Sequence, residues 1–230
     1  MLILQYLKQA EQTTPEIEMT AMQYINVGYQ RILTFEVPGG GFNWWEEDTT
    51  ANTILSAIAV QMFSDTAEVY DAVEQDVINR TVAYLAQTQN VDGSWAAEPN
   101  LHSGNEALGA DGLRTTCYIV WSLAYGGYED DLAVASGANY IEQYIDVEDD
   151  AYTSTLCLNA LLWAKPTSSH ISATLAKLTS TAIVEDEMAH WASGGATWVG
   201  SGGGGADVEV TALAALALAK KGSGQDLLAK

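Results

Sequence analysis

The chain has 230 residues, of which 48% are hydrophobic, and its 30 acidic against 9 basic side chains give a net charge of −21. Such a sequence is long and apolar enough to fold around a sizeable core, and it has no run approaching the ~18 apolar residues that span a bilayer, so we expect no membrane insertion. The negative charge would repel nucleic acid and anionic membrane surfaces, so we expect neither as a partner.

The hydrophobic pattern predicts a series of helices. Apolar side chains recur at spacings of three and four residues, and strand-like alternation is absent. After a helix end at residues 1–10, the predicted helices span residues 17–35, 51–63, 72–88, 113–125, 132–145, 152–164, 168–183 and 208–220. A polar loop is expected over residues 96–111, and an irregular glycine-rich loop over residues 189–206. We therefore predict an all-α fold in a single domain, residues 1–230.

Two helix starts can be read from capping residues. Thr14 followed by Pro15 is typical of an N-cap and a first helical position. Thr49 or Thr50 is expected to cap the helix over residues 51–63.

The two cysteines, Cys117 and Cys157, each lie within an apolar helical run. Two buried free thiols and a single disulfide both fit this placement, and the spacing does not decide between them. No Cys and His spacing suits a zinc site. We therefore expect no metal and no cofactor.

Acidic residues gather in four short runs, most of them between predicted helices. The runs are Glu46 to Asp48, Glu129 to Asp131, Asp146 to Asp150 and Glu185 to Glu187. A charge run in such a place is typically a solvated turn. The alternative is an acidic face that binds a basic partner.

Three turns that combine glycine with aromatic residues recur along the chain, at Gly39 to Trp45, Gln89 to Trp95 and Gly194 to Trp198. Self-similarity of this kind is typical of a repeat architecture, here an outer helix, a turn and an inner helix. The repeat predicts a ring of helical hairpins. Tryptophans at such turns are expected to be core anchors rather than a ligand box. They are Trp44, Trp45, Trp95, Trp191 and Trp198.

The middle turn resembles the QW motif of triterpene cyclases. The matching residues are Arg80, Tyr84-Leu85, Gln89 and Gly93-Ser94-Trp95. In that family the Gln and Trp tie the end of one helix to the start of the next. The resemblance implies a structural role for Gln89, Gly93 and Trp95 in a terpenoid-cyclase-like (α/α) toroid, and it says little about chemistry.

A broader resemblance covers nearly the whole chain and is to the thioester domain of α2-macroglobulins and complement C3-like proteins. The segments that follow the family's order are Leu4 to Leu7, Thr14 to Ile17, Tyr24 to Arg31, Gly41-Phe42, Thr53 to Ala57, Gln89 to Trp95 and Val208 to Leu213. In that family a Cys and a Gln of a Gly-Cys-Gly-Glu-Gln-type motif form an internal thioester. After proteolytic activation the thioester acylates a nearby amine or hydroxyl.

The sequence departs from the family at this motif, because neither Cys117 nor Cys157 lies in a Cys-x-Glu-Gln context. The family's spacing places the thioester before Met1, and the last inner helices after Lys230. We therefore expect an incomplete ring, truncated at both ends, that has no acylating activity alone. The segment Leu101 to Gly109 resembles the loop that carries a catalytic His in complement-type members, which makes His102 the candidate catalytic residue. The alternative is an exposed loop histidine with no role.

The resemblance implies a module of an α2-macroglobulin-like endopeptidase inhibitor, not an enzyme. Its partners would be proteases or other proteins. Its location would be extracellular, periplasmic or at the cell surface. Two other functions stay open. A terpenoid cyclase or prenyltransferase needs an Asp-x-Asp-Asp motif or a zinc site, and Asp146 to Asp150 comes near the first with a different spacing. A non-catalytic acidic protein-binding module is the other alternative.

Overall fold

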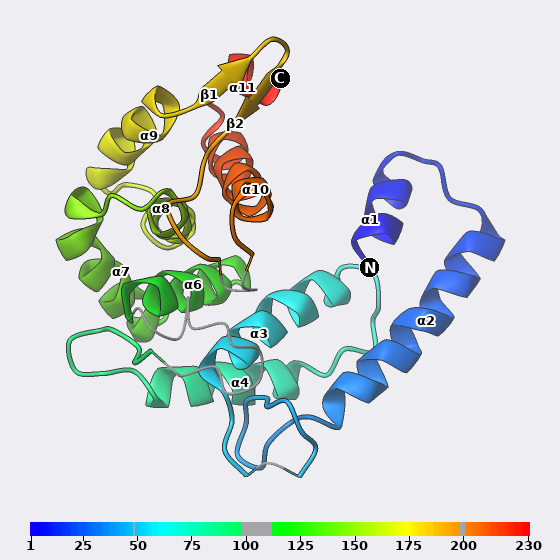
Figure 1. Cartoon of the computed structure of the whole chain (residues 1–230). Helices are drawn as coiled ribbons and strands as arrows, with labels where there is room; N and C mark the ends of the chain where they lie inside the picture. Colours follow the sequence, from blue (N-terminus) through cyan, green and yellow to red (C-terminus); the bar gives the residue numbers. More distant parts are fainter. Residues whose placement is uncertain (48, 98–111, 198–200) are drawn as a thin grey trace. The chain divides into compact units, whose positions relative to one another are not determined.

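The computed structural model describes residues 1–47, 49–97, 112–197 and 201–230. The chain divides into two compact units, Met1–Thr88 and Gln89–Lys230. Helices dominate both units (Figure 1). The prediction of an all-α fold is therefore confirmed, with one short hairpin of strands as the exception among the described residues.

In the part of the first unit that the structure describes there are four helices, of which α3 and α4 pack against each other. They are α1 (Leu2–Gln9), α2 (Pro15–Leu33), α3 (Thr53–Ala67) and α4 (Gln75–Gln87). Helix α2 begins as the sequence predicts, since the side-chain oxygen of Thr14 accepts a hydrogen bond from the backbone nitrogen of Ile17 at 3.4 Å. Pro15 needs no partner at this first helical position because it has no N–H.

The expected cap of α3 is wrong, because Asn52 rather than Thr49 or Thr50 begins the helix. The side chain of Asn52 accepts a hydrogen bond from the backbone nitrogen of Leu55 at 2.9 Å. Its own backbone nitrogen donates to the carbonyl oxygen of Phe42 at 2.8 Å. This bridge holds Asn52 extended, so the helical conformation starts one residue later.

The second unit is built around α8. In chain order, the elements among its described residues are α6 (Gly112–Tyr125), α7 (Leu132–Tyr144), the 3-10 turn η1 (Ile145–Val147), α8 (Ala151–Ala164), α9 (His170–Ser180), β1 (Ile183–Glu185), β2 (Met188–His190), α10 (Gly204–Lys221) and α11 (Gln225–Leu228). Helix α8 packs against α6, α7, α9 and α10, which surround it in Figure 1. Every residue from 152 to 162 is buried. A helix that is buried on all sides is an inner helix of its unit.

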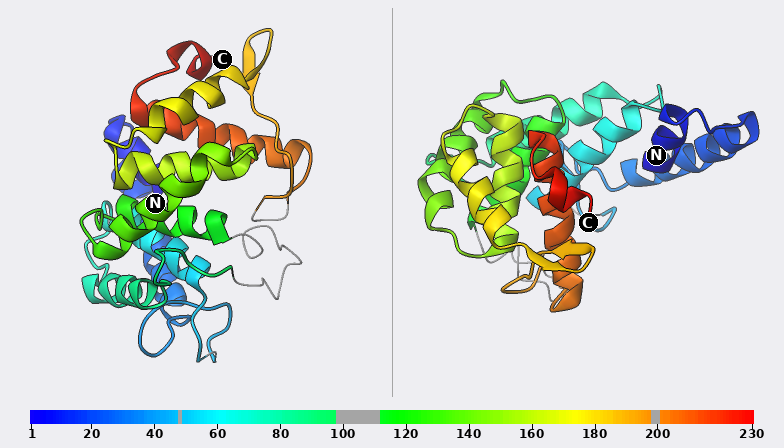
Figure 2. Two further views of the ribbon diagram at one scale, coloured as in Figure 1. Left: turned by 90° about the vertical axis from the view of Figure 1, so that its left-hand side faces the viewer. Right: turned by 90° about the horizontal axis from the view of Figure 1, so that it is seen from above.

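Strands β1 and β2 form an antiparallel hairpin that the sequence analysis does not predict. The expected helix over residues 168–183 stops at Ser180, and the chain turns into the exposed β-branched pair Ile183 and Val184. Each strand has three residues, which is too short to show alternation. Figure 2 shows the hairpin projecting from the helices of this unit.

Helix α10 begins at Gly204, inside the segment expected to be an irregular loop. Gly222 ends it in a left-handed conformation, with a φ of 69°. Within the described ranges, no helix combines the length and the apolar character needed to cross a bilayer.

Candidate functional site

The turn that follows α4 is held by the side chain of Gln89. Its amide nitrogen Nε2 donates hydrogen bonds to the carbonyl oxygens of Gly93 at 2.9 Å and Ala133 at 2.8 Å. The first bond closes the turn, and the second joins the turn to the first turn of α7. Gln89 therefore fixes both the shape of this turn and its place against α7.

Gly93 and Trp95 allow this turn to approach α6 and α7 closely. Gly93 has a φ of +89°, and a Cβ atom there would lie 2.4 Å from the carbonyl oxygen of Ser136. The Trp95 side chain is 1% exposed, and its backbone nitrogen donates to Oγ1 of Thr116 at 2.9 Å. Its ring faces Gly137, where a Cβ would lie 3.0 Å from Cζ3 of the tryptophan. The turn is thus a packing junction made of the smallest and the largest side chains.

The tryptophans of the other two turns differ in their burial. Trp191 is 3% exposed, and its indole nitrogen donates to the carbonyl oxygen of Leu178 at 2.7 Å. Trp44 and Trp45 are 38% and 59% exposed, so their expected role as core anchors is wrong. Phe42 takes that place in the upstream turn, since it is 4% exposed. Trp198 lies outside the described residues.

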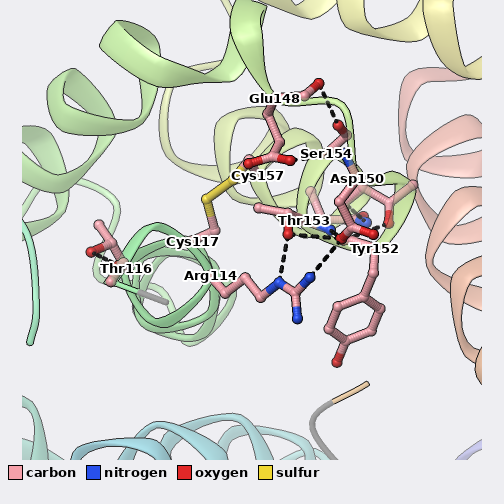
Figure 3. Close-up of a disulfide and its surroundings, with 12 residues drawn as sticks. Arg114, Thr116, Cys117, Glu148, Asp150, Tyr152, Thr153, Ser154 and Cys157 are labelled. Atoms are coloured by element: carbon pink, nitrogen blue, oxygen red, sulfur yellow. Dashed lines mark hydrogen bonds and ion pairs between the residues drawn. A yellow bond between two sulfur atoms is a disulfide. The ribbon is translucent and has the colours of Figure 1, made fainter. Parts of the chain in front are cut away.

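A polar network that the sequence analysis did not single out lies at the amino-terminal ends of α6 and α8 (Figure 3). The Arg114 guanidinium donates from Nη2 to Oδ2 of Asp150 at 2.9 Å, from Nε to Oγ1 of Thr153 at 2.6 Å, and from Nη1 to the carbonyl oxygen of Ala196 at 3.3 Å. Both ion-pair partners are largely buried, with side chains 14% and 19% exposed. Arg114 therefore ties α6 to α8 and to the segment that precedes α10.

Asp150 is also the N-cap of α8. Its Oδ2 atom accepts hydrogen bonds from the backbone nitrogen of Thr153 at 2.8 Å and from the Thr153 hydroxyl at 2.9 Å. The guanidinium also lies over the ring of Tyr152, 5.5 Å from its centroid. The sequence signal for this network is a single arginine in an otherwise apolar helix, which needs a buried partner. The partner itself lies 36 residues further along the chain, beyond the reach of local patterns.

One helical turn along from this network, Cys117 and Cys157 form a disulfide between α6 and α8 (Figure 3). Their Cα atoms are 4.7 Å apart, and both side chains are fully buried. The pairing settles the alternatives that the sequence left open. The chain has two cysteines, so neither thiol is available for other chemistry.

His102, the candidate catalytic residue, lies outside the described residues, as does most of the loop expected over residues 96–111. The other two histidines have local surroundings. His170 begins α9, and its Nδ1 lies 3.0 Å from Oδ2 of Asp146. His190 lies in β2 and is half-buried.

The run from Asp146 to Asp150 is used for structure. Asp146 pairs with His170, Asp149 accepts from Nζ of Lys177 at 2.9 Å, and Asp150 caps α8. Glu129 and Asp130 are exposed, as are the three acidic residues at the hairpin turn. In the parts of the chain that the structure describes, no group of three or more His, Cys, Asp or Glu side chains is placed to hold a metal ion.

Comparison with known proteins agrees with the resemblance seen in the sequence. Ovostatin of Gallus gallus is 24% identical to the chain over 166 residues, which is 70% of the chain. The chain spans 11% of the length of this relative. The family model of the A-macroglobulin TED domain, whose fold is an (α/α) toroid, matches residues 1–227. The toroid of helical hairpins predicted from the sequence is thereby confirmed, and the chain belongs to the A-macroglobulin TED domain family.

Proposed function

We propose that the chain is the thioester-domain module of an α2-macroglobulin-like endopeptidase inhibitor, which traps proteases or tags surfaces through an internal thioester. The observation that carries this proposal is the family match over residues 1–227, which runs through both compact units. The same match supports a single domain over residues 1–230. The role that follows from this match is that of a binding and trapping module rather than that of an enzyme with turnover.

The thioester itself would be supplied by another part of a larger protein. Both cysteines of this chain are joined in the buried disulfide, so neither can form a thioester with a glutamine. Ovostatin is about nine times longer than the matched segment of 166 residues, which spans 11% of its length. The 230-residue chain alone would therefore be unable to acylate a target.

His102 would decide which nucleophile is acylated. A ring nitrogen of a neutral imidazole attacks the thioester carbonyl, the C–S bond breaks, and the cysteine leaves as a thiolate. The thiolate then takes the proton of an incoming hydroxyl, whose oxygen displaces the imidazole to give an ester. This role rests on the resemblance of Leu101 to Gly109 to the family's catalytic loop.

The module would act outside the cytoplasm, in an extracellular or periplasmic space or at the cell surface. The disulfide supports this location, because disulfides persist in oxidising compartments and are rare in the cytosol. Proteases or other proteins would be its partners.

The test is the reaction of the full-length protein with methylamine. The amine attacks a thioester carbonyl, forms an amide and releases one cysteine thiol, so mass spectrometry should find one methylamine adduct and a thiol assay one new thiol. The 230-residue chain is the matched control and should show neither. A full-length protein that takes up no methylamine and releases no thiol would contradict the proposal.

An acidic protein-binding module is the second candidate, and the exposed carboxylates of Glu185, Asp186 and Glu187 support it. Binding of a basic protein that weakens between low and physiological salt would favour it. The cyclase alternative has less support, because its nearest acidic motif, Asp146 to Asp150, is engaged in capping and ion pairs.

A further inference from the structure

A cavity of 340 Å³ opens between α8, α9 and the segment that follows β2. Helices α8 and α9 pack side by side in the second unit (Figure 1). Residues of both helices line the cavity, together with Ile183 of β1. Its volume is in the range of cavities that hold small ligands. It lies apart from the Gln89 turn, and the proposed thioester chemistry makes no use of it.

The hydroxyl groups that line the cavity already use their protons in hydrogen bonds within the protein. Each donates to a backbone carbonyl: Ser154 to Glu148, Thr155 to Ala151, Thr174 to His170, Thr181 to Leu178 and Ser193 to Gly195. The distances range from 2.8 Å for Thr155 to 3.3 Å for Ser154. A hydroxyl whose proton is engaged in such a hydrogen bond can interact with a ligand only through the lone pairs of its oxygen, as an acceptor. These five groups therefore present acceptors to a ligand.

The charged groups at the rim also favour a donor. Asp149 and Asp150 line the cavity, and carboxylates are acceptors. Because Oδ2 of Asp150 is already engaged by Arg114 and by the N-cap hydrogen bond of α8, Asp149 is the more available acceptor of the two. The cation at the rim is Lys177, and its Nζ already donates to the carbonyl oxygen of Glu148 at 2.6 Å and to Oδ1 of Asp149 at 2.9 Å. The chain's net charge of −21 adds a field that attracts cations and repels anions.

The rest of the lining is apolar. Leu158 and Leu178 are contributed by α8 and α9, and Ile183 by the hairpin. A ligand that fits must therefore combine an apolar body with a head that carries several hydrogen-bond donors and a positive charge.

We propose that this cavity binds a primary ammonium group carried on a short aliphatic chain, the chemistry of a lysine side chain. The aliphatic part packs on the leucines and Ile183, while the ammonium donates to the hydroxyl oxygens and to Asp149. The site is non-covalent, so it is independent of whether a thioester is formed elsewhere.

The experiment is a titration of the isotope-labelled 230-residue chain with n-pentylammonium, followed by NMR at the backbone amides of Ser154, Thr155 and Thr181. Two probes of the same length, 1-pentanol and pentanoate, serve as controls for the apolar body alone and for the opposite charge. We expect saturable shifts at these amides with pentylammonium, weaker binding of pentanol and the weakest binding of pentanoate. Pentanol or pentanoate binding as tightly as pentylammonium would overturn the proposal, and so would the absence of saturable shifts.

Two substitutions should act in opposite directions. Asp149→Asn removes an acceptor charge and should weaken pentylammonium binding about two- to fivefold, whereas Lys177→Met removes the competing cation and should strengthen it by a similar factor. The Asp149 side chain is 95% exposed, so the first variant will fold. Glu185→Gln makes the same chemical change at an exposed carboxylate that does not line the cavity. If Asp149→Asn and Glu185→Gln weakened pentylammonium binding equally, the effect would come from the overall negative charge of the chain, and this would contradict a binding site in the cavity.

Discussion

The side-chain amide of Gln89 donates a hydrogen bond to the carbonyl oxygen of Ala133, which lies 44 residues further along the chain. Because the same nitrogen also closes its own turn on Gly93, one side chain fixes both the shape of the turn and its place against α7. The Gln89 to Trp95 turn thus acts as a packing junction against α7 in the second unit.

Loss of this junction should destabilise the chain. Gln89→Ala removes both hydrogen bonds and should lower the free energy of unfolding by about 1–2 kcal/mol. Gln87→Ala changes an exposed glutamine two residues away and should have little effect. Urea unfolding of both variants measures the difference, and equal midpoints would contradict the role assigned to Gln89.

Gly93 should tolerate no side chain. Gly93→Ala imposes a positive φ on alanine and drives its Cβ against the Ser136 carbonyl, so we expect a loss of about 2–4 kcal/mol. The matched control is Gly195→Ala, because a Cβ at Gly195 meets nothing within 4 Å. Thermal unfolding should separate the two variants clearly. A Gly93 variant as stable as the Gly195 variant would mean that the turn relaxes freely.

The Arg114–Asp150 pair should matter more than an exposed pair of the same chemistry. Arg114→Met leaves the largely buried Asp150 carboxylate without its partner and should cost about 2–4 kcal/mol. Arg31→Met breaks the ion pair with Glu46 instead. The Arg31 side chain is 63% exposed and that of Glu46 is 44% exposed, so we expect the free energy of unfolding to fall by less than about 1 kcal/mol. Denaturant titration of both variants is the measurement. A larger loss of stability in Arg31→Met than in Arg114→Met would contradict the structural role of Arg114.

The disulfide between α6 and α8 should stabilise the fold. It joins residues 40 positions apart, and opening a loop of this size typically costs about 2–4 kcal/mol. Adding a reductant should therefore lower the melting temperature, while the double variant Cys117→Ala, Cys157→Ala should be insensitive to it. Two thiols that titrate in the untreated, unfolded chain would show that the bond is absent.

The free energy of unfolding should fall in acid, partly because the Glu142 carboxylate becomes protonated. Burial acts in the opposite direction, but hydrogen bonds from Lys165 and Ser168 hold the pKa of the Glu142 carboxyl below its ordinary value of 4.5. A carboxyl whose pKa is lowered by folding contributes stability above its unfolded pKa and loses it as the pH falls through the folded pKa. We therefore expect wild type to exceed Glu142→Gln in stability at pH 7, with the difference shrinking below pH 4.5. A difference that is constant with pH would contradict this assignment.

Much of the fold could be predicted because the helices carry long periodic patterns. Helix α8, predicted over residues 152–164, and the Thr14 cap of α2 follow directly from local residue types. The hairpin of β1 and β2 could not be predicted, since three-residue strands show no period. The start of α3 differs from the prediction because capping preferences admit Thr49, Thr50 and Asn52 alike. The backbone bridge between Phe42 and Asn52, which only the folded chain shows, sets the residue at which the helix begins.

The site was predictable only where local sequence carries the contact. Gln89, Gly93 and Trp95 stand together in one motif. The ion pair of Arg114 with Asp150 depends instead on α6 and α8 lying side by side, which requires the tertiary structure. The exposure of Trp45 also depends on tertiary packing, in which Phe42 is the buried aromatic residue of that turn.

The central claim is that this chain belongs to a thioester-forming domain whose reactive cysteine lies elsewhere in the protein. Reading the coding sequence upstream of Met1 tests it most directly. The account predicts an in-frame Cys-x-Glu-Gln motif shortly before Met1, which would make His102 the next residue to substitute. A stop codon or an unrelated sequence at that place would contradict the acylation chemistry and would leave a helical toroid that can only bind or support other proteins.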